Sequence, residues 1–201
     1  MLPPLTPERF SADKVHKVAQ FDCGAAHEWE VYLNEWIKGP EALKSMTDWN
    51  TEIWLYYTGN QLVGYGSFGP NRLIWPYNTS LKQQVTIIPA FAVSGAFRRK
   101  PDGVNRHDRF AWRILSDLVC RSLLHGTDML MLYVHKDNSF AQRFYGNFGF
   151  ANAGISRVAD HNLMLFDLRE LRLRIAAPAP MQLVAPEKPR TEADPGVSSS
   201  S

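Results

Sequence analysis

The segment from Asn138 to Phe150 combines residue types, at a particular spacing, that could hold a ligand and donate a proton. It follows an apolar run at 129–134, which predicts a buried strand. Asn138 can cap the helix that follows by accepting a hydrogen bond from a free backbone N–H. Ala141 is small enough for a ligand to lie against that helix, and Tyr145 carries a phenol that can donate a proton. The segment alone leaves open an ordinary core-packing helix in which Tyr145 is a half-buried aromatic residue.

The phenylalanines of this helix predict which of its sides is buried. Phe140, Phe144 and Phe148 recur at every fourth position, so we expect all three to face the core. Because Tyr145 follows Phe144, we expect its ring to point away from this buried stripe. Gly149 suits the left-handed residue that ends a helix.

Length and composition favour one folded domain with an appendage. The chain has 201 residues, 45% of them hydrophobic, and a net charge of +2, which does not by itself argue for nucleic acid or membrane. Two distant cysteines, Cys23 and Cys120, form neither a disulfide framework nor a metal spacing, and they favour a reducing cytoplasm. The six histidines also lack a metal-ligand spacing, so we assign no metal. We recognise no signal peptide and no apolar run of membrane-spanning length.

A change in composition near residue 170 divides the chain. We predict a folded domain over residues 1–170, then a helical end and a disordered tail rich in Pro and Ser over residues 171–201. From Ala176 onward the sequence buries too little apolar surface to offset the entropy of ordering.

Hydrophobic periodicity and turn residues predict a mixed α/β body. The expected helices cover 28–37, 41–46, 108–124 and the segment after Asn138, and the expected strands cover 52–58, 62–68, 85–93, 129–134, 149–156 and 162–166. Pro89 interrupts one strand, and because proline removes a ladder donor, it implies a bulge or an edge. A break between two unrelated strands is the alternative.

The spacing N-x-x-A-x-x-x-Y-x-x-x-G-F from Asn138 to Phe150 resembles the cofactor motif of the GCN5-related N-acetyltransferases. In that family the Asn and the Ala contact acetyl-coenzyme A (acetyl-CoA), and the Tyr lies beside the thioester sulfur. The resemblance implies an α/β fold with a mixed central sheet, a splayed strand pair and flanking helices. The pantetheine arm of the cofactor would lie in the splayed gap and pair with the freed strand edge, and a bulge at Pro89 suits that arrangement.

The family binds the cofactor's diphosphate at the start of its long helix, through a glycine-rich loop and the helix dipole. Arg106 and Ala111 match the pattern Q/R-x-x-G-x-G/A, but Arg109 stands where the first Gly is expected. Either Arg109 and its basic neighbours contact phosphate through charge, or the phosphate site is lost. The basic neighbours are Arg98, Arg99, Lys100, Arg106 and Arg113.

These comparisons predict a set of site residues. Tyr145 is the predicted catalytic residue, which would donate a proton to the departing thiolate. The residues predicted to bind acetyl-CoA are Phe91, Ala92, Val93, Arg106, Arg109, Phe110, Ala111, Asn138 and Ala141. A backbone N–H near Val93 is expected to bind the thioester oxygen. No Asp or Glu lies between residues 83 and 94 to act as a base, which favours an acceptor amine of low pKa.

A closer resemblance lies on the N-terminal side of the chain. Phe21-Asp22-Cys23-Gly24 and Tyr32–Ile37 are similar to the pattern F-x-C-G…L-x-x-[WY]-L of acetyltransferase toxins from bacterial toxin–antitoxin pairs. Cys23 is expected to be a small buried residue. Those enzymes acetylate the amino acid on charged tRNA. The resemblance covers residues 5–168 and implies acetyl-CoA as cosubstrate. The partners that it implies are tRNA, a small antitoxin protein and a second copy of the chain, with no membrane partner. It also implies a cytoplasmic location.

Two other functions stay open. One is an N-acetyltransferase that acts on a small-molecule or protein amine. The other is a catalytically silent domain that keeps the fold as a binding module. The side chain of Arg109 discriminates between these functions. If it reaches the phosphate of the cofactor, the enzyme is favoured, and if it blocks the phosphate site, the binding module is favoured.

Overall fold

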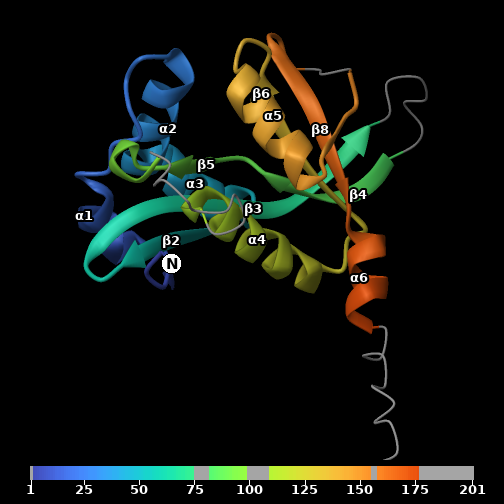
Figure 1. Cartoon of the computed structure of the whole chain (residues 1–201), viewed down its shortest axis with the longest axis horizontal. Helices are drawn as coiled ribbons and strands as arrows, with labels where there is room; N and C mark the ends of the chain where they lie inside the picture. Colours follow the sequence, from blue (N-terminus) through green and yellow to red (C-terminus); the bar gives the residue numbers. More distant parts are fainter. Residues whose placement is uncertain (1, 75–81, 99–108, 155–157, 177–201) are drawn as a thin grey trace, which may run out of the picture.

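The structure is a computed structural model that describes residues 2–74, 82–98, 109–154 and 158–176 (Figure 1). The described residues form an eight-stranded mixed sheet in the order β1-β2-β3-β4-β6-β8-β7, and β5 pairs with β3. The strands are β1 (Thr6–Arg9), β2 (Glu52–Thr58), β3 (Gln61–Ile74), β4 (Lys82–Ile88), β5 (Phe91–Val93), β6 (Met129–His135), β7 (Ala151–Asn152) and β8 (His161–Asp167). The helices are α1 (Val15–Val18), α2 (Glu28–Lys38), α3 (Pro40–Asp48), α4 (Phe110–Ser122), α5 (Ser139–Phe148) and α6 (Leu168–Ala176), with 3-10 turns η1 (Ala12–Lys14), η2 (Gly95–Phe97) and η4 (Leu123–His125).

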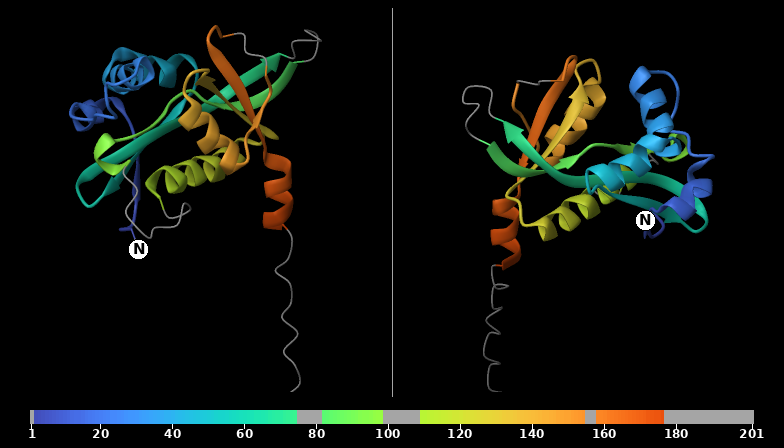
Figure 2. Two further views of the ribbon diagram at one scale, coloured as in Figure 1. Left: turned by 45° about the horizontal axis from the view of Figure 1, so that its top comes forward. Right: turned by 180° about the vertical axis from the view of Figure 1, so that it is seen from behind.

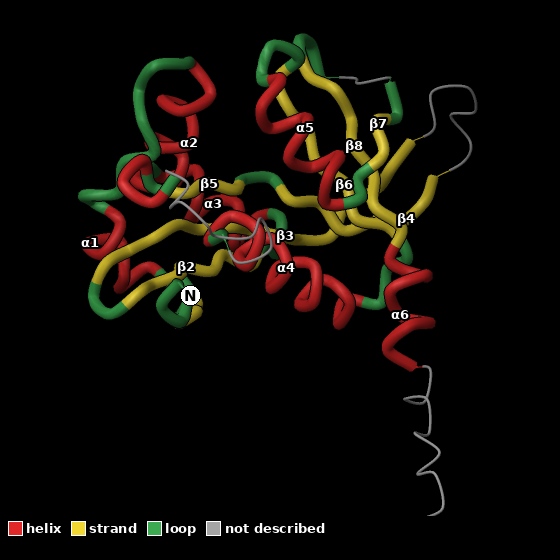
Figure 3. The backbone as a smooth tube through the Cα atoms, viewed as in Figure 1, coloured by secondary structure: helices red, strands yellow, loops and turns green. Residues whose placement is uncertain are grey.

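Helices cover both faces of the sheet, and each face has its own core. One core joins α1, α2 and α3 to the sheet through Val18, Ile37 and Ala42. The other joins α4, α5 and α6 through residues such as Ile114 and Leu168. Figure 2 shows the two groups in a tilted view and from behind, and Figure 3 shows the helices in red around the yellow strands. The arrangement confirms the predicted α/β class.

The predicted strand 85–93 is divided at Pro89, as the proline indicated. β4 pairs in parallel with β6 as far as Ile88 and Leu132, whereas β5 pairs only with β3. Ser67 on β3 spans the break, because its hydroxyl donates to the carbonyl of Ala90 and accepts from the N–H of Ala90, both at 3.0 Å. Both halves therefore stay on β3, which makes the break a bulge and leaves β5 splayed from β6.

Two glycines on β3 let α4 lie directly against the sheet. A Cβ on Gly64 would stand 2.5 Å from the carbonyl oxygen of Ala92 and 3.0 Å from Ile114. A Cβ on Gly66 would stand 2.3 Å from Leu118. These close approaches let Ile114 and Leu118 of α4 pack directly against β3, the strand with which β5 pairs.

Several predicted boundaries change in the structure. The helix expected at 108–124 is α4 followed by η4, and the strand expected at 149–156 is reduced to β7, with residues 155–157 outside the described part. Near the predicted domain end at residue 170, α6 begins at the fully buried Leu168, and Arg172 donates to the Thr127 carbonyl at 2.7 Å. Residues 177–201, predicted to be a disordered tail, lie outside the described residues. Within the described ranges, no helix is both long enough and apolar enough to cross a lipid bilayer.

Candidate functional site

The edge of β5 that faces away from β3 carries backbone groups without a ladder partner. Ser67 N donates to the Ala90 carbonyl at 2.9 Å, and Ser94 N donates to the Val63 carbonyl at 2.8 Å. Because alternate residues of an antiparallel strand bond to the same neighbour, the N–H groups of Phe91 and Val93 point the other way, toward β6. β5 has no second strand neighbour in the described part of the chain. The predicted residues Phe91, Ala92 and Val93 thus form a free strand edge.

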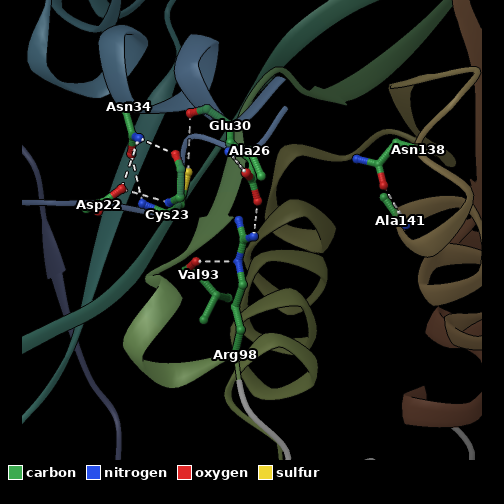
Figure 4. Close-up of polar contacts among 10 residues, drawn as sticks. Asp22, Cys23, Ala26, Glu30, Asn34, Val93, Arg98, Asn138 and Ala141 are labelled. Carbon is green, nitrogen blue, oxygen red and sulfur yellow. Dashed lines mark hydrogen bonds and ion pairs between the residues drawn. The ribbon is translucent and has the colours of Figure 1, made fainter. Parts of the chain in front are cut away.

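The opposite side of this gap is formed by β6 and α5. Asn138 caps α5, because its side-chain oxygen accepts from Ala141 N at 3.0 Å (Figure 4). Gly149 ends the helix with φ of 120°. Both features were predicted from the sequence. The Asn138 cap fixes the first turn of α5 shortly after β6 ends.

The buried side of α5 differs from the predicted one. Phe140 is 73% exposed, whereas Tyr145 is only 8% exposed, so the expectation that Phe140 is buried and Tyr145 points off the core is wrong. The rings of Phe144 and Phe148 pack against Trp112 on α4, at centroid distances of 6.3 and 4.7 Å. Phe140 lies one turn closer to the start of α5 and has no such neighbour among the aromatic contacts of the described residues.

Tyr145 is buried beside the free edge of β5. Its ring centroid lies 6.2 Å from that of Phe91, 5.3 Å from Phe144 and 5.6 Å from Phe150. Burial raises the pKa of the Tyr145 hydroxyl above its ordinary value. None of the hydrogen bonds between described residues is made by this hydroxyl. The phenol is therefore held protonated next to the gap, with its donor uncommitted.

The first turn of α4 presents hydrogen-bond donors. Arg113 N makes the first intrahelical bond, to the Arg109 carbonyl at 3.0 Å, so the N–H groups of Phe110 and Ala111 precede the helical ladder. The Nε of Arg109 is buried without a hydrogen-bond partner, and the first turn contains no acidic residue. Arg106, also predicted to bind the cofactor, lies outside the described residues. An anion at this turn would satisfy groups that are costly to leave unpaired.

Two of the basic residues predicted to surround Arg109 have partners elsewhere in the structure. Arg98 is paired with Glu30, and Arg113 donates to the Pro3 carbonyl at 2.7 Å. Arg99, Lys100 and Arg106 lie outside the described residues. Among the three described members of this group, only Arg109 has a buried side-chain donor without a partner.

Arg98 instead braces the free strand to α2. Its guanidinium group bonds to the buried carboxylate of Glu30, and its Nε donates to the Val93 carbonyl at 3.0 Å (Figure 4). A second oxygen of Glu30 accepts from Ala26 N at 2.9 Å. Burial acts to raise the pKa of Glu30, but the bonds from Arg98 and Ala26 outweigh it, so the pKa lies below its ordinary value. This buried pair was not predicted, although a Glu in the apolar stripe of α2 could have indicated it.

The tetrapeptide Phe21–Gly24 belongs to the same brace. Cys23 is fully buried, and its N–H donates to the Asn34 side-chain oxygen at 2.9 Å. The amide nitrogen of Asn34 in turn donates to the Gly24 carbonyl at 2.8 Å. Burial raises the pKa of the Cys23 thiol to about 11. Cys23 is therefore the small buried residue that the sequence predicted. The motif also contacts the chain just after β5, because Gly95 N donates to the Asp22 carbonyl at 3.0 Å.

The described residues contain no group of three or more His, Cys, Asp or Glu side chains that could hold a metal ion. The groups that this arrangement offers to a ligand are the free backbone edge of β5, the N–H groups at the starts of α4 and α5, and the phenol of Tyr145. A strand edge binds amide groups, and a helix start binds anions. A buried phenol donates a hydrogen bond to developing negative charge.

The sequence matches no protein-family model, and no curated protein matches it. Solved structures share its fold. A mutant of the toxin AtaT, bound to acetyl-CoA and the C-terminus of the antitoxin AtaR, is 14% identical with a TM-score of 0.62, covering 86% of this chain and 99% of that chain. AtaT with acetyl-methionyl-tRNAfMet is 14% identical with a TM-score of 0.59, at the same coverage. A GNAT-family protein from Desulfovibrio desulfuricans is 14% identical with a TM-score of 0.57, covering 82% and 99%. The chain has the fold of the GCN5-related N-acetyltransferases.

Replacing Glu30 tests the brace. We expect Glu30→Gln to lower the free energy of unfolding by about 1–3 kcal/mol, less than for a fully buried pair because Arg98 stays 40% exposed. Since the pKa of Glu30 is lowered in the folded state, its contribution is complete above its ordinary pKa and is lost as the pH falls. Urea titrations should therefore show a constant difference from wild type between about pH 6 and pH 8, which shrinks below about pH 4.3.

Glu35→Gln is the matched control, because it makes the same change at an exposed position of α2. It should alter stability by less than about 0.5 kcal/mol at any pH. Equal effects of the two substitutions would show that the brace contributes nothing specific.

Proposed function

We propose that this chain is an acetyl-CoA-dependent N-acetyltransferase. The observation that carries the proposal is the free edge of β5 with Tyr145 beside it. A free strand edge between two cores recruits an extended ligand that carries amide groups, and the pantetheine arm of acetyl-CoA is such a ligand. The overall similarity to acetyltransferase structures supports the same reading.

The residues around the gap fit the chemical groups of acetyl-CoA. The N–H groups of Phe91 and Val93 would donate to its amide carbonyls. Asn138 and Ala141 would line the other side, as the motif predicts. The unsatisfied Nε of Arg109 and the N–H groups of Phe110 and Ala111 would bind diphosphate oxygens. The helix α5 begins shortly after β6 ends, and α4 begins at Phe110, next to Arg109. The dipole at the start of each helix favours an anion.

The chain's residues would assist the transfer in two ways. A backbone N–H of β5 near Val93 would stabilise negative charge on the thioester oxygen. Tyr145 would donate to the departing sulfur. Since burial raises the pKa of Tyr145 above about 10 and a thiol titrates near 8.5, complete proton transfer is uphill by more than about 2 kcal/mol. Hydrogen-bond donation to developing thiolate charge is therefore its main contribution.

For the acceptor we propose the α-amine of an aminoacyl-tRNA. The similarity to AtaT, whose structure contains acetyl-methionyl-tRNAfMet, supports this choice. The similarity of the Phe21–Ile37 region to toxin sequences supports it too, together with a small antitoxin partner and a cytoplasmic location. A small-molecule or protein amine is the second candidate, favoured by the modest net charge of +2, which is low for a protein that binds tRNA.

Tyr145→Phe tests the catalytic assignment. The substitution keeps the ring contacts to Phe91 and Phe150 and removes only the hydroxyl, so the fold and the acetyl-CoA affinity should stay nearly unchanged. We expect turnover to fall about tenfold to a thousandfold, because the lost interaction forms only as charge develops on sulfur. The measurement is the rate of acetyl transfer to charged tRNA and to a set of free amines, with binding measured by calorimetry. Unchanged turnover would return Tyr145 to the role of a packed core residue.

The Arg109→Ala variant tests whether the Arg109 side chain binds phosphate or obstructs the site. We expect it to weaken acetyl-CoA binding about tenfold or more and to leave acetyl-pantetheine, which lacks the diphosphate, unaffected. Arg143→Ala removes an exposed positive charge on α5 and is the matched control. Stronger binding by the Arg109 variant would mean that this side chain blocks the site, which would favour the silent binding module.

A further inference from the structure

The first turn of α2 contacts both sides of the gap. Glu30 holds the β5 side through Arg98 and the Val93 carbonyl, as shown in Figure 4. Two residues earlier, Glu28 holds the β6 side, because its Oε1 lies 2.9 Å from Nε2 of His135. The ring of Trp29 lies 5.2 Å from that of His135. The gap is therefore bridged on the α1–α3 face of the sheet.

His135 and the residue that contacts Tyr145 lie the same number of residues beyond the end of the β4–β6 pairing. The last paired residues of the two diverging strands are Ile88 and Leu132, and the third residue beyond each is Phe91 (88 + 3) and His135 (132 + 3). Tyr145 contacts Phe91 from the α4–α6 face, whereas His135 contacts α2 on the opposite face. A thioester bound between these two strands would have Tyr145 on the α4–α6 face and the Glu28–His135 pair on the α1–α3 face.

The hydrogen bonds of His135 assign its tautomer. Its Nδ1 accepts from Asp137 N at 3.2 Å, so in the neutral ring Nε2 carries the hydrogen and faces Glu28. The side chain of His135 is 13% exposed and that of Glu28 is 76% exposed. A fixed imidazole thus holds one oxygen of a carboxylate that remains accessible to solvent.

The charges around the pair favour a cationic ligand. Asp137 lies 3.8 Å from His135 Nδ1, and Asp160, at the start of β8, is paired with Lys136. Two further imidazoles lie nearby among the described residues: His161 lies 5.4 Å from His135, and His27 is stacked on Trp29 at 4.4 Å. In the described part of this cluster, three carboxylates (Glu28, Asp137 and Asp160) stand against one lysine (Lys136), which suits an ammonium group.

We propose that the Glu28–His135 pair is the receiving site for the acceptor's primary amine. Glu28 binds the ammonium form and takes its proton, and His135 positions the carboxylate. This inference rests on the proposed acetyl transfer and supplies the base that the strand region 83–94 lacks. It also assigns the approach of the acceptor to the α1–α3 face, opposite Tyr145.

The step balances with these two groups. The ammonium gives one proton to the Glu28 carboxylate, and the neutral amine attacks the thioester carbon. A C–N bond forms, the C–S bond breaks, and the sulfur takes up a proton with the help of Tyr145. The second proton that nitrogen loses passes to solvent, so the products are an amide and a thiol, and solvent restores Glu28.

The test compares Glu28→Gln with Glu35→Gln on a series of primary amines. We expect Glu28→Gln to lower kcat/KM about a hundredfold for an amine as basic as a lysine side chain, and less for an α-amino ester, which is partly neutral at assay pH. Acetyl-CoA affinity should not change. Glu35→Gln should behave as wild type on every amine.

His135 is tested by graded substitution. His135→Gln keeps an N–H donor and should lose less activity than His135→Ala, and the loss should again increase with the basicity of the amine. Two results with an active wild type would overturn this inference alone. One is equal rates for the Glu28 and Glu35 variants, and the other is a loss of activity in the Glu28 and His135 variants that does not depend on amine basicity. A wild type that transfers acetyl to no amine in the series would overturn the proposed function and this inference together.

Discussion

The interruption of strand pairing at Pro89 is the constraint on which the rest of the site depends. A sheet that continued through this position would pair β5 with β6 and leave no room for a ligand. Pro89 removes a ladder donor. On the β3 side, the hydroxyl of Ser67 makes hydrogen bonds to both the N–H and the carbonyl of Ala90. The interruption leaves backbone N–H groups of β5 without strand partners between two hydrophobic cores, and unpaired donors have a free-energy cost. An extended ligand with amide groups removes that cost, which links the bulge directly to binding.

The splayed strand must also be held in place, because a short strand paired on one edge has few contacts of its own. Two features provide this support. The glycines of β3 let α4 pack closely against β3, the one strand neighbour of β5 in the described part of the chain. On the other face, Arg98 joins the Val93 carbonyl to the buried Glu30 of α2. The same first turn of α2 reaches His135 on β6, so one helix fixes the width of the gap.

Local features of the site could be predicted from the sequence, and contacts between distant segments could not. The cap at Asn138, the left-handed Gly149 and the break at Pro89 each follow from one residue and its neighbours. The buried side of α5 was mispredicted because helical periodicity does not reveal how far a neighbouring helix extends, and α4 ends its contact before Phe140. The pairs Glu30–Arg98 and Glu28–His135 join residues far apart in sequence. Arg109 could be located at the helix start, but its unsatisfied Nε is visible only in three dimensions.

The central claim is that the free edge of β5 binds acetyl-CoA by strand-like pairing. Amide hydrogen exchange, resolved by residue with NMR, tests it most directly. On addition of acetyl-CoA, exchange at the N–H groups of Phe91 and Val93 should slow by about tenfold or more, while Ala92 and Ser94, which face β3, should change little. Saturating acetyl-CoA that leaves the exchange of Phe91 and Val93 unaltered would contradict the account.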